Sequence, residues 1–556
     1  MEAPIKKTTG KPRQRAWRPK THSGCKTCKI RRVKCDEEKP QCKRCRSTGR
    51  TCDGYDPAFR APVPPSSLSQ VPPQSRIIRD LTRSQSPIYL ASALRLETRE
   101  ERESFEFFIS HAISSLRGFL DSPFWQREVL QAAHREPAIK HCVFALGAMY
   151  RRFFEGKGSH LTESDMSDKN LQFALRQSNH AIQNLVKEQA PGGAASGKDT
   201  VTMLTCCILF SSMCCLQGYQ KRAILHLRSG IRMINEYESE KTEQHPIDIE
   251  SLRTIFVGLD MQVRGILPTY MSPTWVAKPK TEEFLITPSS NLSMESLLAV
   301  LRYMESLLNH IFAFLQRSCL RPVEESDNVY SEYIDLITRF HRGAIVLGPL
   351  WKQAPAFGDE YIQPLVSLEL LQCQMEYLLR DPRSDMVAKF PFLADFTPAR
   401  EPFTTSFDAT AHFERIFNLS TKLLPSSASV TPVFTTALGP TSALWLTALR
   451  APSSCQALRK CAVQSMISHP RREGFWDGMI AGQIAQEALK LEQERTRVRL
   501  GIMDDTTGDL IVPEDLRIIA VFMTHPEDQD RMAKVEFSDT NDLAIGVPGK
   551  VQWLSW

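Results

Sequence analysis

The sequence predicts two folded parts of unequal size, a small cysteine-rich module and a large, mostly all-α domain, joined by a Pro/Ser-rich linker. Six of the 15 cysteines lie within residues 25–52, 7 Pro and 6 Ser lie within residues 57–87, and helical apolar spacing runs through most of the chain beyond residue 95. We place the boundaries as follows: a basic arm at 1–20, the cysteine module at 21–55, a disordered linker at 56–95, the helical domain at 96–500 and an unassigned C-terminal segment at 501–556.

Positive charge is concentrated in the first 50 residues. They contain 17 Lys/Arg against 4 Asp/Glu, a net charge of +13, whereas the remaining 506 contain 52 against 59, a net charge of −7. This concentrated positive charge attracts a polyanion. Charge alone does not decide whether the polyanion is nucleic acid, an anionic membrane surface or an acidic protein. The stretch from Lys6 to Lys20 predicts a nuclear import signal or a phosphate-contacting arm, with a disordered tail as the alternative. No secretory signal follows Met1, so we expect the protein to stay in a reducing compartment.

The cysteine module contains one spacing written twice. The pattern C-x2-C-x6-C-x6-C-x2-C-x6-C repeats one unit at an offset of 17 and comprises Cys25, Cys28, Cys35, Cys42, Cys45 and Cys52. In a reducing compartment, clustered cysteines are metal ligands more often than disulfides. One tetrahedral zinc takes four thiolates, so two equivalent triplets are best used by two zinc ions that share two sulfurs. Because the segment has almost no apolar core, zinc must provide most of its folding free energy.

Basic residues fill the gap between the second and third of these cysteines. Lys29, Arg31, Arg32 and Lys34 lie on a stretch long enough for about two helical turns, and such a helix fits the major groove of DNA. Arginine pairs bidentately with O6 and N7 of guanine, whereas lysine contacts phosphate. Arg31 and Arg32 are therefore the candidates for base contacts. The alternative is a solvated face that balances the charge of the metal cluster.

Apolar stripes at helical spacing predict the elements of the large domain. The expected helices are 105–116, 122–130, 138–154, 171–186, 200–216, 220–237, 294–314, 334–347, 365–379, 413–424, 444–451 and 478–493. The most apolar of them, 201–216, is too short to span a bilayer, so we expect a buried core helix and no membrane. We predict no element in the last fifty residues.

The cysteine spacing, together with the loop Lys39-Pro40-Gln41-Cys42, resembles the fungal zinc binuclear cluster family of transcription regulators. The body resembles the fungal-specific transcription factor domain in Asp121 to Trp125, around Leu216 to Gly218, in His226 to Gly230 and in Arg472 to Asp477.

That resemblance implies specific roles for residues of the module. Cys25 and Cys42 are the bridging ligands of two zinc ions, the first helix reads a CGG triplet, Arg31 and Arg32 match base contacts, and Lys29 and Lys34 match phosphate contacts. It implies a nuclear regulator of RNA polymerase II transcription of metabolic pathway genes, with double-stranded DNA and the transcription machinery or co-regulators as partners. No sustained heptads follow the module, so a homodimer would lack a coiled coil.

Other features of the sequence have structural interpretations. Cys206, Cys207, Cys214 and Cys215 share one helix with no His or Asp nearby and predict core cysteines. Arg471 to Asp477 predict a helix cap and packing corner. No nucleophile, phosphate-loop or metalloprotease motif is present, so we expect no enzyme. The alternative function is a zinc-dependent scaffold that binds protein or RNA without sequence-specific DNA recognition.

Overall fold

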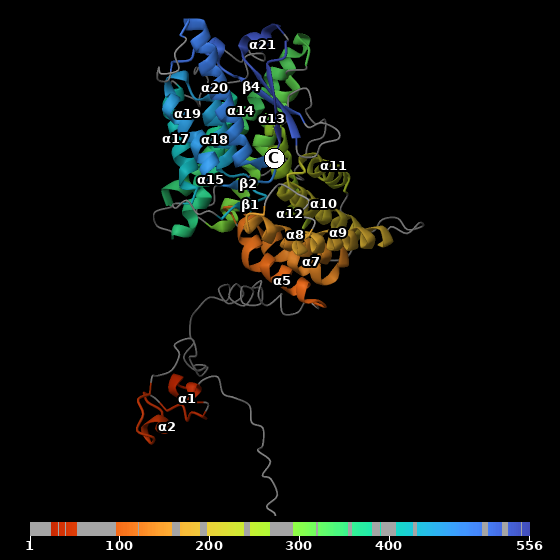
Figure 1. The fold of residues 1–556 in the computed structure, drawn as a ribbon, viewed down its shortest axis with the longest axis vertical. Coiled ribbons are helices and arrows are strands. Elements are labelled where there is room, and N and C mark those ends of the chain that lie inside the picture. The colour runs from red at the N-terminus through yellow and green to blue at the C-terminus, as the bar shows by residue number, and fades with distance from the viewer. Residues whose placement is uncertain are drawn as a thin grey trace, which may run out of the picture. The chain divides into compact units, whose positions relative to one another are not determined.

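The computed structural model of the chain divides by its contacts into two units, Met1–Thr82 and Arg83–Trp556 (Figure 1). The residues that the structure describes are 24–31, 33–38, 40–52, 96–120, 122–157, 167–188, 197–237, 245–266, 293–318, 321–353, 358–380, 390, 407–425, 431–502, 510–524, 532–545 and 547–555. The predicted basic arm, the predicted linker up to residue 95, Arg32, Lys39 and Asp121 lie outside these residues.

The small unit contains two short helices, α1 (Lys26–Ile30) and α2 (Lys43–Arg46). They are connected by loops without regular structure, and each helix begins directly after a cysteine.

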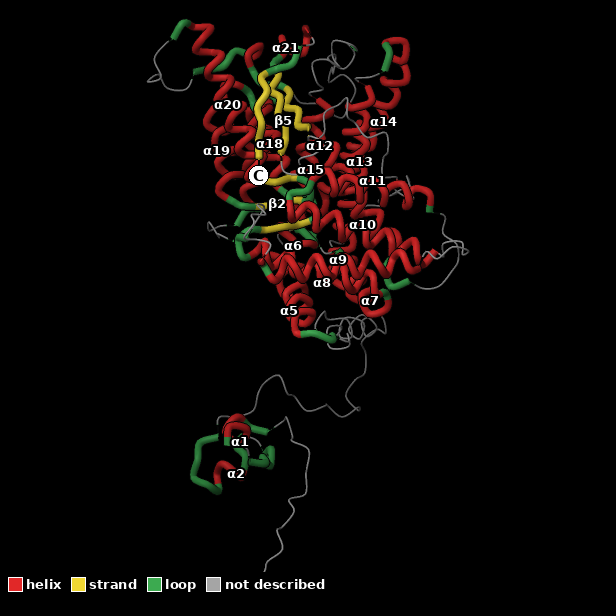
Figure 2. Tube along the Cα trace, turned by 45° about the vertical axis from the view of Figure 1, so that its right-hand side comes forward, coloured by secondary structure: helices red, strands yellow, loops and turns green. Residues whose placement is uncertain are grey.

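The large unit is mostly helical, as predicted (Figure 2). Its helices and helical turns are α5 (Arg99–Phe107), η2 (Phe108–Ala112), α6 (Ile113–Leu116), η3 (Phe124–Glu128), α7 (Val129–Arg135), α8 (Pro137–Phe154), α9 (Lys169–Glu188), α10 (Gly197–Gln217), α11 (Gln220–Glu236), α12 (Ile249–Ile266), α13 (Met294–Ser318), η6 (Val323–Glu325), α14 (Ser326–Gln353), η8 (Asp359–Tyr361), α15 (Ile362–Arg380), α17 (Ala409–Lys422), α18 (Pro440–Arg450), η10 (Ser453–Cys455), α19 (Gln456–Ser468), α20 (Gly478–Leu500), η11 (Glu514–Leu516) and α21 (Thr540–Ile545). Each predicted helix overlaps one or more of these elements.

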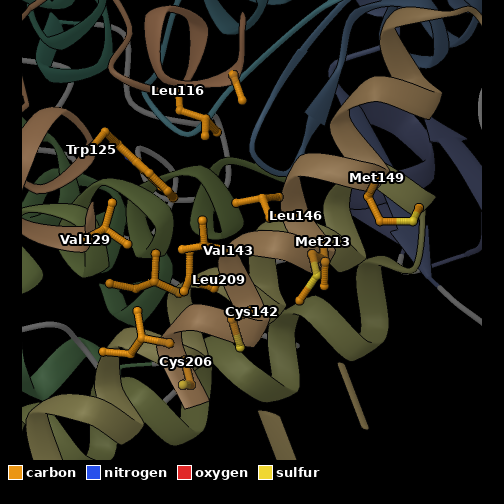
Figure 3. Packing of buried hydrophobic residues seen from close by; sticks show 14 of the residues in the cluster. Leu116, Trp125, Val129, Cys142, Val143, Leu146, Met149, Cys206, Leu209 and Met213 are labelled. Carbon is orange, nitrogen blue, oxygen red and sulfur yellow. The ribbon is translucent and has the colours of Figure 1, made fainter. Parts of the chain in front are cut away.

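The first half of the body packs around α8 and α10. Cys206 lies among apolar side chains beside Cys142, Val143 and Leu209 in this core, so the prediction of a core cysteine is confirmed for it (Figure 3). Burial raises the pKa of the Cys207 thiol to about 12, which keeps it protonated and unreactive.

Among the described residues, two helices are long and apolar enough to cross a membrane: residues 200–217 of α10 and all of α13. The expectation that the α10 segment is too short for this was wrong, because the helix is longer than its apolar run. Most of the apolar 18-residue stretch of each helix is buried inside the body, 67% in α10 and 61% in α13. Both are therefore accounted for as core helices of the fold, as predicted for the segment in α10.

Helix α12 was not predicted, because polar residues interrupt its apolar stripe. Asp260 and Arg264 are buried and form an ion pair at 3.3 Å. Across the interface with α13, Asn309 donates to Asp260 at 3.0 Å and Arg264 donates to Gln316 at 3.1 Å. Tertiary partners thus satisfy side chains that a sequence pattern assigns to the solvent-facing side.

A small sheet joins the two halves of the body. Strand β1 (Val433–Thr435) pairs in parallel with β2 (Arg471–Glu473), which pairs antiparallel with β3 (Trp476–Asp477). The buried Glu473 carboxylate accepts from the backbone N–H groups of Gly439 and Thr441 at the start of α18. Asp477 caps α20 by accepting from Met479 N at 3.0 Å, in agreement with the predicted cap and packing corner.

Long-range hydrogen bonds connect this sheet to the first half of the body. Arg472 donates to the Leu216 carbonyl at 2.7 Å, and Trp125 donates to Thr436 Oγ1 at 3.0 Å. The turn at Gly474 has a φ of 55°, and a Cβ there would lie 2.0 Å from Gln262 Oε1, which accepts from the next backbone N–H. Only glycine fits this turn.

The C-terminal residues, for which we predicted no element, form an antiparallel sheet of β4 (Ala520–Thr524), β5 (Met532–Ser538) and β6 (Lys550–Ser555). Alternate residues of β5, namely Ala533, Val535 and Phe537, are fully buried against α18 and α20. The segment is therefore part of the core of the body.

Candidate metal centre and nucleic-acid interface

The two helices of the small unit begin in the same way. Cys25 Sγ accepts from the backbone N–H of Cys28 at 3.4 Å, and Cys42 Sγ accepts from that of Cys45 at 3.3 Å. These equivalent caps follow from the equivalent C-x2-C spacing. The N–H groups also stabilise negative charge on sulfur.

The six sulfurs gather into two groups of four. One group contains Cys25, Cys28, Cys35 and Cys42, and the other contains Cys25, Cys42, Cys45 and Cys52; within each, all sulfurs lie within 4.8 Å of one another. Cys25 and Cys42 belong to both groups, and their sulfurs are 3.6 Å apart. In the described part of the chain, no other side chains group in this way.

These separations fit zinc. A tetrahedral zinc with Zn–S bonds of about 2.3 Å places its sulfurs about 3.8 Å apart. Within the groups, the Cys25–Cys42, Cys25–Cys45 and Cys28–Cys42 sulfurs are 3.6–3.8 Å apart. Five of the six cysteines are buried and Cys52 is half-buried. Two four-sulfur sites with two common members suit two zinc ions.

Burial raises the pKa of the Cys42 thiol to about 12 and raises that of Cys25 further. Burial also raises the pKa of Cys28. Without a cation these thiols stay protonated at neutral pH, and a zinc ion supplies the positive charge that stabilises the thiolates.

The basic helix differs from the prediction of about two turns between Cys28 and Cys35. The helix α1 starts earlier and ends at Ile30, and Arg31 is its C-terminal cap. Because Cys25 caps the N-terminus and Val33 N donates back to the Cys28 carbonyl at 3.1 Å, the chain leaves the helix early and returns Cys35 to the metal site. The capping by Cys25 and the return of the chain to the sulfur cluster therefore set the length of the helix.

The predicted DNA-contacting residues lie on or just after α1. Lys29 and Lys34 are exposed, and Arg31 is half-buried with one guanidinium nitrogen donating to Thr48 Oγ1 at 3.3 Å. A guanidinium has five N–H donors, so this contact positions Arg31 and leaves donors for a ligand. Arg32 lies outside the described residues.

The structure adds groups that the sequence analysis missed. Asp36 accepts from the backbone N–H groups of Lys43 and Arg44 at 2.7 and 2.8 Å, and although desolvation opposes it, these hydrogen bonds lower its pKa. Glu38 pairs with the Lys43 ammonium at 3.6 Å. Two acidic side chains therefore contact the start of α2, one through its backbone N–H groups and one through the Lys43 side chain. A carboxylate seven residues before a basic helix was the signal available in the sequence.

The described residues of the small unit contain 8 Lys/Arg against 3 Asp/Glu, a net charge of +5 before the metal cluster is counted. A metal-held module with an exposed basic helix belongs to the class of zinc-dependent nucleic-acid-binding modules.

Comparison with known proteins agrees with this class and narrows it. Residues 23–62 match the fungal Zn(2)-Cys(6) binuclear cluster domain, and residues 103–340 match the fungal specific transcription factor domain. The small unit therefore carries a Zn(2)-Cys(6) binuclear cluster domain, which binds two zinc ions, and the body carries a fungal specific transcription factor domain. The proteins that share these domains with the chain are transcription regulators rather than enzymes.

Curated relatives are similar to parts of the chain. The aspercryptin biosynthesis cluster-specific transcription regulator atnN of Emericella nidulans is 31% identical over 261 residues, which is 44% of this chain and 40% of the relative. The transcription regulator lscL of Purpureocillium lilacinum is 28% identical over 222 residues, 38% of this chain and 49% of the relative. The transcriptional regulatory protein moc3 of Schizosaccharomyces pombe is 51% identical over 47 residues, 8% of each chain.

The chain spans less than half the length of the first two of these curated relatives. No solved structure matches the chain.

Proposed function

We propose that this protein is a nuclear regulator that binds CGG-type triplets in the major groove and controls RNA polymerase II transcription of metabolic pathway genes. The observation that carries the proposal is the basic helix α1, which the metal-site residue Cys25 caps at its N-terminus and which carries the metal-site residue Cys28 within it. The Emericella nidulans relative, which is named as the regulator of one biosynthesis cluster, supports the pathway part.

In this proposal the residues of the module divide into three roles. Cys25 and Cys42 bridge the two zinc ions, since both belong to each four-sulfur group. Arg31 and Arg32 contact guanine, and the exposed Lys29 and Lys34 contact phosphate, because arginine offers a bidentate fork and lysine a point charge.

The division of the chain is part of the proposal. Residues 21–55 bind DNA and residues 56–95 connect this module to the body. Residues 96–500, together with the C-terminal sheet that completes their core, form a regulatory domain that contacts co-regulators or the transcription machinery. Binding as a homodimer would double the number of half-sites read without a coiled coil next to the module.

The test compares the full-length zinc-loaded protein on duplexes with a CGG triplet and with a scrambled triplet, across a salt series. Arg31→Ala and Arg32→Ala should each lose about 1–3 kcal/mol of the preference for CGG. Lys29→Ala should weaken binding to both duplexes equally and reduce the log–log salt slope by about 0.9. Arg135→Ala, at an exposed position on the body, is the matched control.

Equal binding of both duplexes by the wild-type protein would refute triplet recognition. Zinc-dependent binding with weak, sequence-independent DNA affinity would instead support the scaffold that recognises protein or RNA.

A further inference from the structure

The body contains a cavity of about 60 Å³ between α12, α13, the chain from α6 to η3 and the segment that follows β1. Most of its wall is apolar, formed by Leu116, Leu120, Trp125, Ile255, Leu298 and Leu301. Three charged residues, Arg117, Arg302 and Glu305, also line it.

Glu305 faces this cavity without a partner for its carboxyl group. Its side chain is 5% exposed, and no hydrogen bond or ion pair joins it to a described residue. Gly258 lies opposite, and a Cβ there would be 3.7–3.8 Å from the two carboxyl oxygens, so glycine keeps this end of the cavity open. Burial raises the pKa of Glu305 to about 8. An unsatisfied buried carboxyl group is costly and is rare in native folds.

Arg302 lies three residues before Glu305 on α13, which puts both side chains on one face of the helix. Its Nε is buried with no hydrogen-bond partner, and the two residues are not within ion-pair distance of each other. Arg117, the third charged residue of the wall, has interactions with other groups. The cavity therefore offers one carboxyl and one guanidinium group beside an apolar wall, neither of them hydrogen-bonded or ion-paired to a described residue. The Arg302 charge acts on Glu305 through space and partly offsets the rise in the Glu305 pKa.

We propose that this cavity binds a small zwitterion, an α-amino acid with a short aliphatic side chain, whose ammonium pairs with Glu305 and whose carboxylate pairs with Arg302. The volume supports this size: about 10–15 Å³ holds one water, so 60 Å³ has room for roughly four to six waters, comparable to a small amino acid. The apolar wall accommodates the aliphatic side chain. The site is on the body and goes beyond the proposed DNA recognition, on which it does not depend.

The test uses the full-length zinc-loaded protein in titration calorimetry near pH 7 with glycine, L-alanine, L-valine and L-leucine. Isobutylamine and 3-methylbutanoate, which are L-valine without its carboxylate and without its ammonium, report each charge separately. At least one amino acid should bind, and L-valine should bind about ten- to a hundred-fold more tightly than either analogue, because each charged hydrogen bond is lost in one of them. The ligand's ammonium pairs with the ionised form of Glu305, and at pH 7 the free Glu305 is mostly protonated because its pKa is raised to about 8. Binding should therefore release close to one proton, which is measured by comparing buffers of different ionisation enthalpy.

Two variants test the contributions of Glu305 and Arg302 separately. Glu305→Gln should weaken L-valine and isobutylamine about ten-fold or more, leave 3-methylbutanoate unchanged and abolish proton release, and it should fold because the carboxyl group has no partner to lose. Arg302→Met should weaken L-valine and 3-methylbutanoate but not isobutylamine. Glu295→Gln, exposed on the same helix, is the matched control. Absence of binding by all four amino acids, analogues that bind as tightly as L-valine, or L-valine binding that Glu305→Gln leaves intact would each overturn the proposal.

Discussion

The proposed bridging roles make a prediction about zinc stoichiometry. Cys52 belongs to one four-sulfur group and Cys42 to both. Cys52→Ser leaves the group of Cys25, Cys28, Cys35 and Cys42 complete, so this variant should keep one zinc firmly bound. Cys42→Ser reduces both groups to three sulfurs, so both zinc ions should be weakened.

The size of the effect follows from counting ligands. Structural zinc contributes about 10–16 kcal/mol when four ligands hold it, or roughly 2.5–4 kcal/mol per sulfur if the sulfurs contribute equally. Loss of one sulfur then weakens a zinc by about 70- to 900-fold. Cys52→Ser should show this loss at one metal and Cys42→Ser at two.

Native mass spectrometry after dialysis against a graded chelator measures the result directly. At a chelator concentration that leaves the wild-type protein with two zinc ions, Cys52→Ser should hold one and Cys42→Ser none. Cys461→Ser, at an exposed cysteine of the body, should keep both. If Cys42→Ser and Cys52→Ser each retain one zinc, Cys42 is not a shared ligand and the bridging assignment is wrong.

Three predictions concern the body. Gly230→Ala should destabilise it by about 1–3 kcal/mol, because a Cβ would lie 2.4 Å from the Phe256 ring; an unchanged urea midpoint would contradict this contact. Arg459 and Glu492 form a fully buried two-point ion pair at 2.7 and 2.9 Å, so Glu492→Gln should cost about 3–5 kcal/mol and the apolar double replacement Arg459→Met with Glu492→Leu should cost less, as a double-mutant cycle measures. Burial lowers the pKa of His226, so the folded state binds fewer protons than the unfolded one and stability should fall as pH drops through about 6.5; melting temperatures should show His226→Phe with a flatter profile, and an identical profile would count against the shift.

The metal site was predictable because its information is local. All six ligands lie within residues 25–52, and the repeated spacing alone indicates two equivalent halves. The length of α1 was not predictable in this way. It depends on the capping of Cys28 N by Cys25 Sγ and on the return of the chain through Val33, which are consequences of metal-site geometry rather than of helix propensity.

Elements of the body were predicted where one face is apolar and missed where tertiary contacts set the pattern. The helix α12 buries Asp260 and Arg264, which removes the contrast between faces on which the prediction depends. Strand β5 alternates Ala533, Val535 and Phe537 with polar residues, a period-2 signal that was present in the sequence but short and next to Pro and Gly.

The contacts that organise the body join residues far apart in the chain. Trp125 and Thr436 are 311 residues apart, and Arg472 and Leu216 are 256 apart, yet each pair is hydrogen-bonded in the interior. A motif such as Arg472 to Asp477 therefore identifies a family resemblance without revealing its role, because its partners cannot be found from spacing. The same argument explains why Glu305 could not be selected from sequence: one glutamate on an amphipathic helix looks solvated until the structure shows Gly258 opposite it and an apolar wall around it. Chemistry built from neighbouring residues, like the zinc cluster, can be derived from one sequence, whereas chemistry built by packing distant helices needs the fold.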